Sequence, residues 1–173
     1  RLRNLMPKKV KHLDEFTEEE SAEVFEGPPD KIVPNKFPTL TGFPYRIAII
    51  GEAPGKDEVS QGEPFVGMSG KLLSALLGKA NIVREACYIG NICQVRPPYN
   101  EIDRFDRDGP EITSDIKQLK EDLIQFDPNL CVLLGKTALW AAICEDTISN
   151  WRGSLVHGNH HLLGYKCLPS YHP

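Results

Sequence analysis

The sequence predicts an α/β protein of three layers, in which helices cover both faces of a mostly parallel sheet of about four strands. Apolar runs at residues 47–50 and 130–134 have the length and composition of buried strands. Segments with a helical spacing of apolar residues alternate with these runs along the chain. This alternation is typical of parallel sheets covered on both faces, and it predicts the fold class.

The 173 residues are enough for one domain with a real core and an appended arm. Residues 1–44 are predicted to be an acidic, proline-rich N-terminal arm, and residues 45–173 to be the domain. Residues 1–11 hold five bases and no acid, and residues 14–30 hold eight acids and no base. The acidic run is interpreted as a solvated face, with a DNA mimic or a partner-docking surface as the alternative. A capping-box spacing at Thr17 predicts a short helix, and five prolines in residues 27–44 predict extended chain draped over the domain.

The first predicted unit of the domain is a strand at residues 47–50, a loop that begins at Gly51, and a helix. The loop is rich in glycine, proline and acid, and it contains Phe65. The helix is predicted from four leucines expected on one face, namely Leu72, Leu73, Leu76 and Leu77. A loop at the carboxyl end of a strand is the usual place for a ligand in an α/β domain.

The remaining elements follow in order. A strand at residues 86–91 ends in Asn91 and leads into a polar, proline-bearing loop, and a helix is predicted at about 114–126. A strand at 130–134 and a helix at about 136–144 come next. Residues 153–157 and 160–163 are predicted to form a hairpin around a Gly158-Asn159 turn, before a last strand at 165–169. The carboxyl ends of the strands are expected to gather three loops, at residues 51–67, 91–100 and 170–173.

Charge and hydropathy exclude several classes of protein. The net charge of -4 does not suggest a general nucleic-acid binder. No run approaches 18 apolar residues, so no membrane helix is predicted. No apolar signal core follows the basic N-terminus, so the protein is expected to be cytoplasmic and not secreted. The chain starts at Arg1 rather than Met, which is typical of a fragment or a processed chain.

Five cysteines without a Cys-x-x-Cys pair predict reduced, mostly buried thiols. Two segments resemble a phosphate loop, but residues 51–56 lack the hydroxyl residue after the lysine and residues 130–137 lack the first glycine. A zinc site could be drawn from His157, His160 and His161 with a cysteine. His160 and His161 are adjacent on the predicted hairpin and are expected to point to opposite faces, so no metal site is predicted.

Three loop segments carry a family pattern: GEAPGKDEVSQGEPFVGMSGKLL, NICQVRPPYN and LPSYHP. Together they resemble the uracil-DNA glycosylase superfamily, most closely the group called family 4, in order and approximate spacing from about residue 45 to residue 173. The segment ISNWRG at residues 148–153 also resembles the family's approach to its last motif. The resemblance implies an enzyme that flips uracil out of DNA and hydrolyses its N-glycosidic bond.

The resemblance also implies roles for individual residues. Phe65 would stack on the uracil ring, and Asn91 would pair with uracil N3–H and O4 and reject cytosine. His172 would donate a hydrogen bond to O2 of the departing uracil anion. Residues of the first loop would surround the base with backbone, and they comprise Gly51, Ala53, Pro54, Gly55, Gly62 and Gly67.

In the family, carboxylates of the first motif position or activate water and offset the positive charge on the sugar. The matching acids are Glu52, Asp57 and Glu58. Glu58 is favoured for the water or cation role, Glu52 for shaping the pocket, and the assignment among the three stays open. Ala53 stands where other branches of the superfamily carry a catalytic Asp, so that direct base is absent.

The sequence departs from family 4 in two places. The family's four-cysteine iron–sulfur cluster is expected to be absent, because residues 1–86 hold no cysteine and Cys93 is displaced from the family position. The family also continues past His-Pro into a loop that enters the DNA minor groove, whereas this chain stops at Pro173. A truncated sequence or one domain of a larger protein is therefore expected.

Two functions remain open at this point. The first is a uracil-DNA glycosylase that acts on uracil-containing DNA in base excision repair. The second is a catalytically weak or inactive module attached to a DNA polymerase or replication complex, because cluster-free domains of this kind resemble those of some phage-type polymerases. In that case the protein would be associated with the nucleoid or with replication in an infected host.

Overall fold

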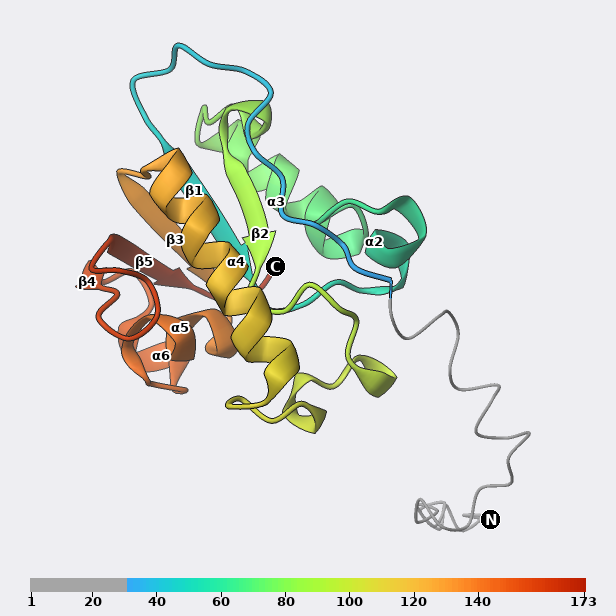
Figure 1. Ribbon diagram of the computed structural model, residues 1–173. Coiled ribbons are helices and arrows are strands. Elements are labelled where there is room, and N and C mark those ends of the chain that lie inside the picture. The colour runs from blue at the N-terminus through green and yellow to red at the C-terminus, as the bar shows by residue number, and fades with distance from the viewer. Residues whose placement is uncertain (1–30) are drawn as a thin grey trace, which may run out of the picture.

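The computed structural model describes residues 31–173, which form a five-stranded sheet between helices (Figure 1). The strand order is β2 (Tyr88–Asn91), β1 (Ile47–Gly51), β3 (Leu130–Leu134), β5 (Lys166–Ser170) and β4 (Val156–His157). Strands β2, β1, β3 and β5 run parallel, and β4 pairs antiparallel with β5. The predicted fold class is confirmed, with five strands in place of about four.

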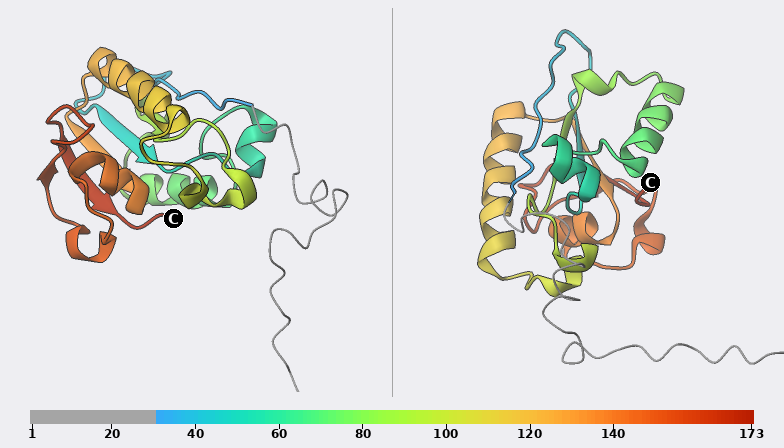
Figure 2. Two further views of the ribbon diagram at one scale, coloured as in Figure 1. Left: turned by 60° about the horizontal axis from the view of Figure 1, so that its bottom comes forward. Right: turned by 90° about the vertical axis from the view of Figure 1, so that its right-hand side faces the viewer.

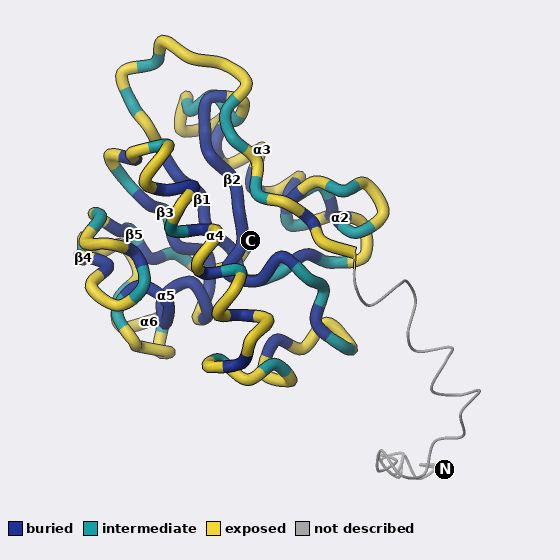
Figure 3. The backbone as a smooth tube through the Cα atoms, viewed as in Figure 1, coloured by how far each residue is buried: buried dark blue, intermediate teal, exposed yellow. Residues whose placement is uncertain are grey.

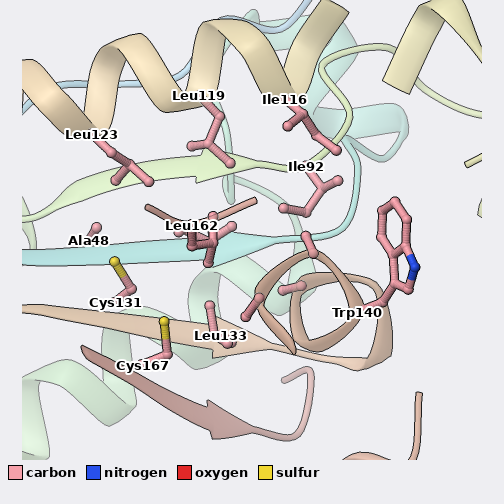
Figure 4. Close-up of a cluster of buried hydrophobic side chains, with 14 of the residues drawn as sticks. Ala48, Ile92, Ile116, Leu119, Leu123, Cys131, Leu133, Trp140, Leu162 and Cys167 are labelled. Carbon is pink, nitrogen blue, oxygen red and sulfur yellow. The ribbon is translucent and has the colours of Figure 1, made fainter. Parts of the chain in front are cut away.

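Strand β1 is buried on both sides because its residues alternate between two cores. Ile47 and Ile49 pack with residues of α3 (Met68–Lys79), whereas Ala48 and Ile50 pack with residues of α4 (Pro110–Phe126) and α5 (Lys136–Ile143). Figure 2 shows α3 and α4 on opposite faces of the sheet. Figure 4 shows the larger core, in which α4 and α5 close over the strands. Figure 3 shows β1 and β2 buried along their length.

Helix α4 begins four residues before the predicted start. Gly109 caps it and Pro110 occupies its first position, where a missing N–H costs nothing and the fixed φ favours a helix. The buried face repeats every three or four residues, at Ile112, Ile116, Leu119 and Leu123. The short helix α6 (Ile148–Trp151) precedes β4.

Three expectations about individual elements are wrong. Leu73 and Leu77 of α3 are buried, but Leu72 and Leu76 are 48% and 49% exposed, because residues next to each other on a helix point about 100° apart. The loop after β1 contains a helix, α2 (Lys56–Gln61), that was not predicted because it lacks an apolar stripe.

The predicted hairpin is the third error, because β4 pairs with β5 and not with residues 160–163. The backbone N–H groups of His160 and His161 donate to the carbonyls of Ala142 and Ala141 at the end of α5. The last carbonyls of a helix lack partners within it, so they accept from the segment that follows. The last strand covers Lys166–Ser170, one residue later than expected.

Residues 31–44 run as largely irregular chain beside the outer edge of β2 (Figure 1). Lys36 and Ile89 exchange two backbone hydrogen bonds of 2.8 and 2.9 Å, and the Val33 N–H donates to the Gln94 carbonyl at 2.8 Å. The side chain of Val33 is buried. The helix predicted near Thr17 and the acidic run lie outside the described residues.

Cys87, Cys93, Cys131 and Cys167 are buried free thiols, and Cys144 is a free thiol at the surface. Burial raises the pKa of Cys87 to about 11 and that of Cys93 to about 12, so both stay protonated near neutral pH. The expectation that the thiols are mostly buried is confirmed, and their reduced state stays a prediction. Among the described residues, no helix combines the length and apolar character needed to cross a bilayer.

Candidate active site

A cavity of about 560 Å³ opens at the carboxyl edge of the sheet. Segments that follow β1, β2, β3 and β5 line it, as the carboxyl ends of parallel strands favour. The lining residues are Glu52, Ala53, Gly55, Lys56, Asp57, Glu58, Phe65, Gly67, Met68, Ser69, Asn91, Pro97, Asn100, Gly135, Lys136 and His172. The three loops expected to gather at this edge therefore do meet.

Most of the residues predicted for the site line this cavity, and three of them do not. Pro54 is buried outside the lining. Gly62 ends α2 in a left-handed conformation, with φ of 73°, and its N–H donates to the Glu58 carbonyl. Gly51 lies behind the lining, where two predicted side chains converge on it.

The convergence at Gly51 explains why this position needs glycine. A Cβ atom there would lie 2.4 Å from Cζ of Phe65 and 2.6 Å from Oδ1 of Asn91. Any larger residue would push one of these side chains aside. The first loop and β2 can therefore present an aromatic ring and an amide to the same cavity only because Gly51 has no side chain.

Phe65 occupies a conformation that its surroundings must hold. Its φ is 55°, in the left-handed region that costs a non-glycine residue free energy. One guanidinium nitrogen of Arg84 donates to the carbonyls of Pro64 and Phe65, at 3.2 and 2.9 Å. Burial lowers the pKa of Arg84. The Phe65 ring is 6% exposed and stacks with the ring of His172, with 6.0 Å between centroids and 26° between planes.

Asn91 ends β2 and is 3% exposed. Its backbone N–H donates to Oδ1 of Asn35 at 3.1 Å. Within residues 31–173, Oδ1 of the Asn91 side chain has no hydrogen-bond partner. A buried acceptor without a partner destabilises a fold, so it calls for a functional explanation.

Glu58 has both carboxylate oxygens engaged by backbone N–H groups. Oε1 accepts from Val66 at 3.0 Å and from Gly67 at 2.8 Å, and Oε2 accepts from Gly55 at 3.1 Å. The bonds from Val66 and Gly67 tie the loop that carries Phe65 to the first turn of α2, and the bond from Gly55 caps that helix. The carboxylate is thus a loop-holding group, and a direct role of Glu58 on water stays a prediction.

The other two acids occupy different surroundings. The hydroxyl of buried Thr137, in α5, donates to Oε2 of Glu52, which fixes that carboxylate against the cavity wall. Asp57 lies in the first turn of α2 and is exposed at the cavity. Of the three acids, Asp57 is therefore the one most open to solvent.

His172 lies against the start of α5. A Cβ atom on Gly135 would be 3.4 Å from Cβ of His172, which is ordinary van der Waals contact, and the φ of 94° at Gly135 favours glycine there. The Gly135 N–H donates to the Ser170 carbonyl at 3.0 Å, which brings the last segment onto the turn after β3.

Lys136, Pro97 and Asn100 also line the cavity, and sequence reasoning did not select them. Lys136 donates to Asp103 at 2.8 Å, and this hydrogen bond lowers the pKa of Asp103. The sequence could have identified Lys136 as a site residue, because it comes directly after the turn that follows β3. The carboxyl end of β3 lies at the same edge of the sheet as the carboxyl ends of β1 and β2.

The described residues do not fit a four-cysteine iron–sulfur cluster. They hold no group of three or more His, Cys, Asp and Glu side chains placed to ligate a metal. Cys131 and Cys167 are opposite each other in register on β3 and β5 (Figure 4), whereas the Cys93 thiol donates to the Val95 carbonyl at 3.2 Å.

The two adjacent histidines do not point to opposite faces, and that expectation is wrong. The rings of His160 and His161 lie 3.8 Å apart by their centroids, and both contact Trp140. Their segment is not a strand, so the alternation of a strand does not apply to them.

Comparison with known proteins identifies the family to which the chain is similar. Residues 40–173 match the family model for the uracil DNA glycosylase superfamily. Three similar proteins are type-4 uracil-DNA glycosylases, and the chain is 38% identical over 104 residues to that of Archaeoglobus fulgidus, 36% over 131 residues to that of Thermotoga maritima, and 33% over 135 residues to that of Saccharolobus solfataricus. These matches cover 60%, 74% and 73% of this chain, and 50%, 64% and 60% of the respective relatives. The chain thus spans between half and two thirds of the length of these relatives.

Proposed function

Because the chain belongs to the uracil-DNA glycosylase superfamily, we propose that it releases uracil from DNA by hydrolysing the bond between the base and its sugar. The observation that carries the proposal is the buried Oδ1 of Asn91, which has no partner among the described residues. Asn91 lines the cavity, and its Oδ1 and the Phe65 ring both lie next to Gly51. This atom matches the N3–H donor that uracil offers.

The amide of Asn91 suits uracil and not cytosine. Uracil presents a donor at N3 and an acceptor at O4, which pair with Oδ1 and Nδ2 of an asparagine. Cytosine presents an acceptor at N3 and a donor at its amino group, so both pairs would fail inside a buried site. A site built to pair with such groups rejects the wrong ligand strongly, because its own polar atoms are then left unpaired.

The aromatic ring of Phe65 would replace part of the stacking that the base loses when it leaves the DNA. In this proposal the bond from C1′ to N1 breaks, and its electron pair leaves with the uracil anion. His172 stabilises that anion by donating to O2. Water adds to C1′ of the oxocarbenium-like sugar, and the proton that it gives up neutralises the uracil anion, which leaves an abasic site and free uracil.

We assign the carboxylates from their surroundings. Asp57, in place of the Glu58 that the sequence favoured, positions the water, because Asp57 is exposed at the cavity and Glu58 is buried. Glu52 shapes the wall through its bond with Thr137, and Glu58 holds the loop of Phe65. All three negative charges also favour the positive charge that develops on the sugar.

The experiment is a gel assay for abasic sites on single-stranded oligonucleotides that carry one uracil, cytosine or thymine. Single strands are used because no base pair then has to open. Abasic sites are expected from uracil alone, and Asn91→Ala and His172→Ala are expected to slow release by at least about 100-fold. Absence of release by the wild-type chain would contradict the proposal and favour the alternative of a module that binds without chemistry.

A further inference from the structure

The side chain of Asn35 connects the N-terminal segment to the predicted base-reading residue. Its Oδ1 accepts the backbone N–H of Asn91 at 3.1 Å, and its Nδ2 donates to Oδ2 of Asp122 in α4 at 3.0 Å. Asn35 lies 56 positions before Asn91 in the chain, so only folding of this segment onto β2 brings them together.

Asn35 occupies the place of a missing strand partner. Lys36 pairs with Ile89 through two backbone bonds, and the next N–H on the same edge of β2 is that of Asn91. The segment continues backwards through Pro34, which has no N–H and ends regular pairing. The side-chain carbonyl of Asn35 therefore takes the role of a backbone acceptor for Asn91.

Asp122 sets the orientation of the Asn35 amide. Asp122 is 8% exposed, and its carboxylate accepts from Tyr88 at 2.8 Å and from Gln118 at 2.9 Å as well as from Asn35. A carboxylate accepts only, so the NH₂ of Asn35 must face Asp122 and the oxygen must face Asn91. The oxygen is also close to Gly90, where a Cβ atom would lie 2.5 Å from it.

We propose that Asn35 is a positioning residue for uracil recognition, because it fixes the backbone of Asn91 and thereby the direction of the Asn91 amide. This inference rests on the proposed function of the same site. A hydrogen bond on the backbone of a base-reading residue matters because small displacements of a positioned group reduce rates strongly. Asn35 itself touches no substrate in this proposal.

The test compares Asn35→Ala with Gln118→Ala in the full chain. Both variants remove one hydrogen bond to Asp122, but only Asn35→Ala removes the bond to Asn91. Two quantities are measured: the hydrogen-exchange rate of the Asn91 amide, and single-turnover release of uracil at limiting and saturating DNA. Asn35→Ala is expected to speed exchange at Asn91 and slow release by about tenfold each, whereas Gln118→Ala leaves both within about twofold.

A charge swap separates positioning from folding. Asn35→Asp alone places a second carboxylate next to that of Asp122, and the repulsion between them is expected to slow uracil release. Asn35→Asp combined with Asp122→Asn restores a donor facing an acceptor and keeps an acceptor for the Asn91 N–H. It is expected to recover part of the rate, because the Tyr88 hydroxyl donates to the same Oδ2 of Asp122 and must turn to another acceptor.

Two results would overturn the inference: unchanged exchange at Asn91 in Asn35→Ala, or equal slowing of release in Asn35→Ala and Gln118→Ala. Failure of the proposed function gives a different result. In that case the wild-type chain releases no uracil, and the exchange rate at Asn91 still shows whether Asn35 holds its backbone.

Discussion

Asp57 and Glu58 are neighbours in α2, yet their carboxylates have different surroundings. Three backbone N–H groups donate to Glu58, which is 9% exposed, whereas Asp57 is exposed at the cavity. The sequence could identify both as candidate acids but could not rank them. The ranking depends on where the loop of Phe65 returns to α2, which is a tertiary contact.

Substitution of the two acids should separate chemistry from folding. Asp57→Asn is expected to lower the rate of uracil release by about 100-fold and to change the free energy of unfolding by less than about 0.5 kcal/mol, as is usual for an exposed residue. Glu58→Gln turns an NH₂ group toward backbone donors and is expected to cost about 1–3 kcal/mol of stability. Urea denaturation and single-turnover assays measure both, and a fully active Asp57→Asn would refute the water-positioning role.

Phe65, Asn91 and His172 could be selected from the sequence because each lies in a recognisable motif that ends or follows a predicted strand. Their meeting in one cavity follows from parallel strands that share an edge. Asn35 could not be selected, because its role depends on the course of residues 31–44 beside β2. Nothing in the residues around it marks such a contact.

His161 should make stability depend on pH. Desolvation, then the neighbouring charges of His160 and Lys120, lower its pKa to about 4 from 6.5, while Asp108 acts in the opposite direction. The folded protein binds this proton less readily than the unfolded chain does. Its contribution to stability is therefore complete above pH 6.5 and is lost as the pH falls toward 4.

The measurement is the free energy of unfolding of wild type and His161→Gln from pH 7.5 to pH 4. The variant is expected to lose less stability over this range than the wild type. His157→Gln is the control, because its ring is exposed and bonds to the Gly164 carbonyl at the surface. Identical pH profiles for wild type and His161→Gln would disprove the assignment.

At the scale of elements, the start of α3 and the turn at Phe65 fit against each other. A Cβ atom on Gly70 would lie 1.8 Å from the Phe65 carbonyl oxygen, so the helix can approach the turn only through glycine. Arg84 donates to the same carbonyl at 2.9 Å. The conformation of Phe65 is thus held by two elements at once.

Two alanine substitutions in α3 test this contact. Gly70→Ala is expected to displace the turn of Phe65 and reduce uracil release by more than about 10-fold, with a loss of stability of about 1–3 kcal/mol from overpacking. Gly78→Ala is the matched control, because nothing lies within 4 Å of its Cβ position. It is expected to keep full activity and to gain up to about 1 kcal/mol from helix propensity. Release by Gly70→Ala at the wild-type rate would contradict the contact.

The sequence predicted long elements well and short ones poorly. The periodic face of α4 and the apolar runs of β1 and β3 are strong signals, because burial of many apolar residues decides those structures. The six residues of α2 carry no apolar stripe, and tertiary bonds to Glu58 stabilise the loop that follows it. Strand β4 has two residues, so pairing with β5 rather than any local pattern defines it.

In the molecule as a whole, the sheet supports the loops at its carboxyl edge, where the cavity lies. Loops after four parallel strands meet there, and residues 31–44 close the outer edge of β2 beside them. Both helical layers pack on the sheet and leave this edge open to the cavity. The proposed association with a DNA polymerase stays a prediction, as does the division at residues 44 and 45.

Binding of the free base tests most directly whether the Asn91 amide recognises uracil in this cavity. Titration of the full chain with uracil and with cytosine can be followed by calorimetry, and the titration with uracil also by the NMR signal of its N3 proton. Uracil is expected to bind with a shifted N3 proton signal and cytosine to bind at least about 100-fold more weakly, and Asn91→Ala is expected to abolish the difference. Equal affinities of wild type for uracil and cytosine, or an unchanged preference in Asn91→Ala, would contradict recognition of uracil by the Asn91 amide.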